Sequence, residues 1–200
     1  MPGMPPPGDD ERQTLLRFLA FQQNAFLAVS HGLTDEQARS TPSVSALSIG
    51  GLVKHATAVQ RGWTQRAASA PGFPAADPRP MNEIMAEYAD QYVMHDDDTL
   101  EALLERLKTQ NADTLAVFAT ANLDAAVPVP REVPWFPQDV SQWSVRWVAL
   151  HLVEELSRHA GHADIIRESV DGATMYELMA AAEGWPETDW IKPWSPGGSN

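Results

Sequence analysis

The stretch from Trp147 to Ile166, WVALHLVEELSRHAGHADII, determines both the fold and the candidate site. Its apolar residues recur every three to four positions, which predicts a long amphipathic helix. At about 100° per residue, Glu155 and His159 lie ~40° apart on this helix. His151 and His162 fall within ~40° of Glu155 by the same geometry. Apolar residues share this face, so we expect it to be buried: Val148, Leu152 and Ile166.

A carboxylate and an imidazole on a buried helix face indicate a metal site. Burying a carboxylate without a partner costs several kcal/mol. A cation bound by Glu155 and His159, which are four residues apart, would offset that cost. The alternative is a buried polar network without a metal.

A third candidate ligand, His55, lies on the helix predicted from Ser48 to Ala68. One face of this helix carries Leu52, His55, Val59 and Trp63, so His55 should point inward. Three protein ligands and one open position are typical of a catalytic zinc site. His151 is the alternative to Glu155. His162 is the alternative to His159, or else it orients the site.

The rest of the chain predicts an all-α four-helix bundle. The other long helices should run from Asp9 or Asp10 to about Ser30, from Thr99 to about Ala121, and from near Ser141 to Asp171. Short helices are expected after Thr34, around 82–89 and over 175–182. A long crossover, residues 70–96, joins the second and third long helices. We expect one domain over residues 9–195, between a disordered segment at 1–8 and a loose tail at 196–200.

Composition excludes several classes of function. The formal net charge of the 200 residues is -13, from 27 acidic and 14 basic residues, which argues against binding nucleic acid or an anionic membrane. There is no cysteine, so metal ligands must be nitrogen or oxygen atoms and any thiol must come from outside the chain. The N-terminus lacks a signal-peptide pattern and no apolar run reaches ~20 residues, which predicts a cytoplasmic protein.

Two segments, SIGGLVKHATAVQRGW around His55 and HLVEELSRHAGHADIIRES around Glu155, resemble the DinB/YfiT-like superfamily of metal-binding four-helix bundles. RHAGHADI resembles the mini-circle-protein branch. The resemblance implies the ligands His55, Glu155 and His159, because mycothiol-dependent maleylpyruvate isomerases use a His, Glu, His set. Many relatives have histidine where this sequence has Glu155. Those isomerases also contain a C-terminal domain for which this chain is too short, so the resemblance supports the metal site rather than the isomerase reaction.

The resemblance further implies a metal-dependent thiol S-transferase. A low-molecular-weight thiol, such as mycothiol or bacillithiol, would attack an electrophile as a metal-bound thiolate. The metal would be divalent, with zinc preferred over nickel, iron or manganese. The resemblance also implies a homodimer, with the thiol and the electrophile as its small-molecule partners.

Other side chains are candidates for catalysis and cofactor binding. His162 and His151 are the candidate catalytic residues, since either could act as a general base. Trp63, Trp135 and Arg158 are the candidates for binding the thiol cofactor. Two alternative functions remain at this point, namely a metal-dependent hydrolase that uses bound water and a non-catalytic, stress-related bundle.

Overall fold

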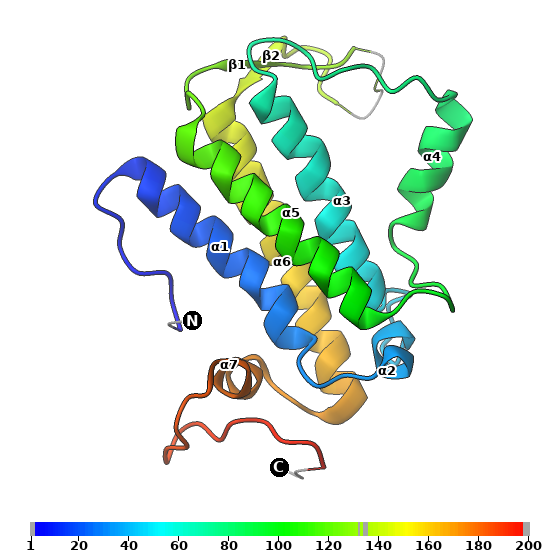
Figure 1. Cartoon of the computed structure of the whole chain (residues 1–200), viewed down its shortest axis with the longest axis vertical. Coiled ribbons are helices and arrows are strands. Elements are labelled where there is room, and N and C mark those ends of the chain that lie inside the picture. Colours follow the sequence, from blue (N-terminus) through cyan, green and yellow to red (C-terminus); the bar gives the residue numbers. More distant parts are fainter. Residues whose placement is uncertain (1–2, 132, 134–135, 198–200) are drawn as a thin grey trace.

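The computed structural model describes residues 3–131, 133 and 136–197 (Figure 1). This part of the chain forms a bundle of four long helices with three short helices and a two-stranded antiparallel sheet, which confirms the expected all-α fold. The long helices are α1 (Glu11–Val29), α3 (Ile49–Ala68), α5 (Leu100–Thr120) and α6 (Val145–Asp171). The short elements are α2 (Asp35–Arg39), α4 (Met81–Asp90), α7 (Met175–Glu183), β1 (Ala126–Pro128) and β2 (Gln142–Ser144).

Helices α3 and α5 run parallel to each other. The Thr64 hydroxyl of α3 lies 2.9 Å from that of Thr114 on α5, and Gln60, one turn earlier, donates to Asn111 at 2.9 Å. Parallel neighbours in a bundle need a long connection between them. Residues 69–99 provide it, and they carry α4 along the side of the bundle beyond α3 (Figure 1). The expected long crossover is therefore present.

Helices α1 and α6 also run parallel. Arg146 at the start of α6 pairs with Glu11 at the start of α1, with 2.6 Å between Nε and Oε1. Near the other end, Arg167 donates to the backbone oxygen of Val29 at 2.7 Å. Because α6 also contacts α3, it has neighbours on two sides, and its buried face is correspondingly broad.

The four long helices begin at side chains that accept a hydrogen bond from the first turn. The caps of α1, α3 and α5 are Asp10, Ser48 and Thr99, which agrees with the helix starts expected from the sequence. The expected start of the last long helix near Ser141 is wrong. It begins at Val145 with Ser144 as its cap, because residues 142–144 are extended and pair with β1.

The small sheet closes one end of the bundle (Figure 1). Val127 of β1 pairs with Trp143 of β2, and both side chains are buried. From the sequence alone, residues 122–141 are predicted to be a loop. Strands of three residues are too short to show the alternation by which a strand is recognised, and Pro128 and Pro130 favour a loop assignment.

The C-terminal segment returns to the bundle through Trp194. The Arg167 guanidinium lies 4.8 Å from the centre of the Trp194 ring. Gly32, with φ of 72°, also faces this ring, and a Cβ atom there would collide with it. Three tryptophans in a tail rich in proline and glycine, Trp185, Trp190 and Trp194, predict packing on the bundle. Trp194 confirms this prediction, whereas the side chain of Trp190 is exposed.

Helix α4 carries exposed apolar side chains, but it is too short to span a membrane. None of the residues of α4 is buried, and Met81, Met85 and Tyr88 are exposed. Across the described ranges, every helix is too short or too polar to cross a bilayer.

Asp164 on α6 is a polar residue in an apolar environment. It lies beside Phe21 of α1 and Leu178 of α7, and no described residue donates a hydrogen bond to its carboxylate. Burial, followed by repulsion from Glu168, raises the pKa of Asp164 to about 6. The ordinary value is about 3.9. The folded state therefore binds a proton more tightly than the unfolded state, and the free energy of unfolding should fall as pH rises from about 4 to about 6.

Asp164→Asn should therefore stabilise the protein by about 1–2 kcal/mol at pH 7.5, with allowance for partial solvent screening. The gain should vanish near pH 3, where the carboxyl is largely protonated in both states. Urea unfolding with a chelator present would measure it, and Asp113→Asn on an exposed part of α5 is the matched control. A gain of equal size at both pH values would show that charge burial is not its cause.

Candidate metal centre

Three side chains from two helices meet at one point. The Nε2 atom of His55 on α3 lies 3.3 Å from Oε1 of Glu155 on α6, and Nε2 of His159 lies 3.4 Å from the same oxygen. The side chain of His55 is 3% exposed, while those of Glu155 and His159 are 24% and 17% exposed. The group is thus anchored in the bundle and accessible to solvent from the side of α6.

The antiparallel packing of α3 and α6 brings these residues together. His55 in the first half of α3 meets Glu155 in the middle of α6, whereas Trp63 near the end of α3 meets Trp147 near the start of α6. Leu52 and Leu152 are fully buried on the same two faces. The apolar residues therefore hold the helices together at the level at which the polar atoms converge.

The spacing and chemistry of the three side chains fit a divalent metal. The candidate ligand atoms all lie within 4.8 Å of one another. Two ligands that are each about 2.0–2.2 Å from a tetrahedral ion lie about 3.3–3.5 Å apart, as the Nε2–Oε1 pairs do. Two imidazole nitrogens and one carboxylate oxygen suit zinc and similar divalent ions. His55, Glu155 and His159 could therefore hold the ion and leave a fourth position for another ligand.

Electrostatics and hydrogen bonding at the site favour the same arrangement. Hydrogen bonds from His159 and then from His55 hold the pKa of the Glu155 carboxyl well below its ordinary value. The Nδ1 atoms of His55 and His159 are buried, and no described residue is a partner for either. Both rings thus make their polar contacts through Nε2, and each Nε2 faces the ionised carboxylate, which is the orientation that a shared cation would require.

Tyr92 is a neighbour of the site that the sequence analysis missed. Its ring stacks on that of His55, with centroids 4.2 Å apart, and its hydroxyl oxygen lies 3.3 Å from Nε2 of His55. Burial raises the pKa of Tyr92 to about 12, with smaller contributions from Tyr88 and Glu155. Because Tyr92 lies in the crossover, outside any periodic segment, nothing in the sequence pattern pointed to it.

The other candidate histidines lie outside the converging group. His151 packs between Trp63 and Trp147, at ring-centroid distances of 4.6 Å and 5.1 Å, and its Nδ1 lies 3.5 Å from Oε2 of Glu154. His162 is exposed, and its ring centroid lies 6.1 Å from that of His159. The expectation of a buried face is therefore wrong for His162, while Val148, Leu152 and Ile166 are buried as expected.

Of the candidate cofactor-binding residues, Trp63 and Arg158 are described, and neither belongs to the converging group. Trp63 is buried in an aromatic cluster with Phe136, Trp143, Trp147 and His151. It is eight residues from His55, or about 12 Å along the helix axis. The side chain of Arg158 is 73% exposed and lies 3.9 Å from Glu154. Trp135 lies outside the described residues.

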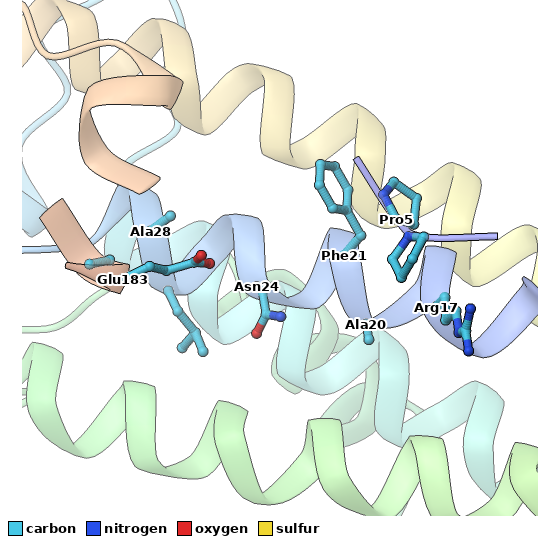
Figure 2. Close-up of a pocket in the computed structure, with 10 residues that line it drawn as sticks. Pro5, Arg17, Ala20, Phe21, Asn24, Ala28 and Glu183 are labelled. Carbon is cyan, nitrogen blue, oxygen red and sulfur yellow. The ribbon is translucent and has the colours of Figure 1, made fainter. Parts of the chain in front are cut away.

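A cavity of about 420 Å³ lies elsewhere, between α1, α7 and the segment at Pro5 (Figure 2). Its charged residues already have partners. Arg17 donates to the backbone oxygen of Pro7, and Glu183 accepts from the Trp185 indole at 2.9 Å. None of the three candidate ligands lines this cavity, so it is separate from the candidate metal centre.

Comparison with known proteins identifies the family. The family model described as mycothiol S-transferase matches residues 14–172, which include His55, Glu155 and His159. The chain belongs to the mycothiol S-transferase family. This result confirms the DinB/YfiT-like resemblance. A conserved protein from Enterococcus faecalis of known structure has the same fold, with 14% identity and a TM-score of 0.55 over 83% of this chain and 100% of that chain. A comparison with curated proteins finds no match.

Proposed function

We propose that the protein is a metal-dependent S-transferase that joins a mycothiol-type thiol to an electrophile. The observation that carries the proposal is the convergence of His55, Glu155 and His159 on one point in a member of this family. Because the chain has no cysteine, the sulfur nucleophile must be an external thiol. We further infer that zinc is the resident ion and that the protein is a cytoplasmic homodimer.

The charges of the three side chains suit this chemistry. Two neutral imidazoles and one carboxylate leave a divalent ion with a net charge of about +1, which a single thiolate would neutralise. A bound ion would supply Lewis acidity, so that a thiol in the fourth position would react as its thiolate at neutral pH. His55, Glu155 and His159 would hold and orient the ion.

The overall transfer is balanced without a redox partner. The sulfur of the thiol forms a bond to an electrophilic carbon, and the leaving group departs with the electron pair of the bond that breaks. The proton of the thiol passes to solvent, which reaches the site where Glu155 and His159 are partly exposed. Aromatic side chains along α6, including Trp147, provide apolar surface toward which an electrophile could extend.

The direct test is conjugation of mycothiol to monochlorobimane, followed by fluorescence and by loss of free thiol. Zinc-loaded protein should accelerate the reaction at least about tenfold over chelator-treated protein. His55→Ala, incubated with the same total zinc, controls for catalysis by free ion. Equal rates for the loaded protein, the chelated protein and His55→Ala would refute the proposed function.

A further inference from the structure

The crossover brings one side chain, Tyr92, into contact with the candidate metal centre. Tyr92 belongs to the segment between α4 and α5, 37 residues beyond His55 along the chain. It is partly buried, and its ring lies nearly parallel to that of His55, at an angle of 17°. Its hydroxyl thus reaches the same Nε2 atom that contacts Glu155.

The fold holds Tyr92 in this place by close backbone packing. Gly51, in the first turn of α3, lies directly against the backbone of Tyr92, and a Cβ atom at that position would collide with the Tyr92 carbonyl oxygen. Lys54 anchors the flanking residues, with Nζ 3.4 Å from Asp90 and 3.1 Å from Asp98. Since α3 also carries His55, the helix that supplies the ligand also positions the tyrosine.

The hydrogen-bonding capacity of Tyr92 changes when His55 binds an ion. A coordinated Nε2 carries no proton and has its lone pair on the metal, so it can neither donate to a hydroxyl nor accept from one. The side chain of Tyr88 also interacts with Tyr92. A tyrosine hydroxyl has one proton and two acceptor lone pairs. When Nε2 of His55 is bound to an ion, the Tyr92 hydroxyl can therefore turn its single proton toward another group.

We propose that Tyr92 is a positioning residue whose hydroxyl donates a hydrogen bond to the sulfur, oxygen or nitrogen atom of a ligand at the fourth position of the metal. This inference rests on the proposed function for the identity of that ligand as a thiol. A competing role would make Tyr92 itself the fourth metal ligand and close the site. The two roles differ in a measurable way, because only the competing role makes metal affinity depend strongly on the hydroxyl.

Cobalt-substituted protein tests the proposal without relying on activity. Visible absorbance would measure the affinity of wild type, Tyr92→Phe and Tyr176→Phe for cobalt, and then for mycothiol and for azide. Tyr176 lies on α7, away from the site, and is the matched control. We expect Tyr92→Phe to keep cobalt affinity within about threefold and to lose roughly tenfold or more in affinity for both probes, as for a hydrogen bond to a charged group.

Each other outcome is decisive. Unchanged affinity of Tyr92→Phe for both probes would overturn the inference. A loss of cobalt affinity beyond about threefold would also overturn it, because the hydroxyl would then act on the metal ion or its protein ligands rather than on the bound probe. A wild type that binds azide in a Tyr92-dependent manner but does not bind mycothiol would reject the proposed function and support the role of Tyr92. Circular dichroism would confirm that each variant is folded.

Discussion

Replacing His159 by alanine should lower the affinity of the protein for zinc by more than about 100-fold. Changes in residues that only support a ligand typically cost 10–100-fold, and the removal of one of three direct ligands should exceed that range. Nε2 of His159 lies 3.4 Å from Oε1 of Glu155, and the imidazole makes no other polar contact with a described residue. Competition with a chromophoric chelator would measure the affinity.

His162→Ala is the matched control, because His162 is one turn away on the same helix but is exposed. We expect its zinc affinity to remain within about threefold of wild type, since it contributes no converging atom. The reverse pattern, in which His162→Ala loses zinc and His159→Ala retains it, would show that His162 is the ligand in place of His159. Thermal unfolding in chelator would show whether either variant is destabilised.

Arg167→Met should destabilise the fold by about 3–5 kcal/mol, because it leaves buried polar groups without a partner. The side chain of Arg167 is fully buried. It donates to the backbone oxygens of Val29 and His31 at 2.7 and 2.8 Å and pairs with Asp171 at 2.9 Å. Its stacking under Trp194 would be lost as well.

Thermal unfolding of Arg167→Met should show this loss of stability as a fall of roughly 10 °C in the midpoint temperature. Arg158→Met is the matched control, since Arg158 lies on the same helix but is largely exposed, and its change should stay within about 0.5 kcal/mol. Equal midpoints for the two variants would show that the buried hydrogen bonds of Arg167 add nothing to stability.

Local periodicity predicted the long helices and the inward faces that carry the candidate ligands, whereas the choice of His55, Glu155 and His159 over His151 and His162 came from the family resemblance. His55 shares a face with buried Leu52, and Glu155 and His159 lie one turn apart, so antiparallel packing alone brings them together. The starts of α3 and α5 at Ser48 and Thr99 were recognisable for the same reason, since a cap depends on the next three residues.

Features that depend on contacts between distant segments were not predictable in this way. His162 has almost the same angular position on α6 as Glu155, but periodicity does not say whether a neighbouring helix covers that turn. Trp63 shares a face with His55, yet it lies two turns farther along α3, in an aromatic cluster. The place of Tyr92 depends on the approach of the crossover to Gly51, which no local pattern encodes.

Anomalous diffraction from crystals of the zinc-loaded protein, recorded at the zinc absorption edge, tests the central claim most directly. We predict one strong peak within about 2.0–2.2 Å of Nε2 of His55, Nε2 of His159 and a carboxylate oxygen of Glu155. A zinc peak bound only elsewhere on the protein, or no peak at these three side chains at saturating zinc, would contradict the account.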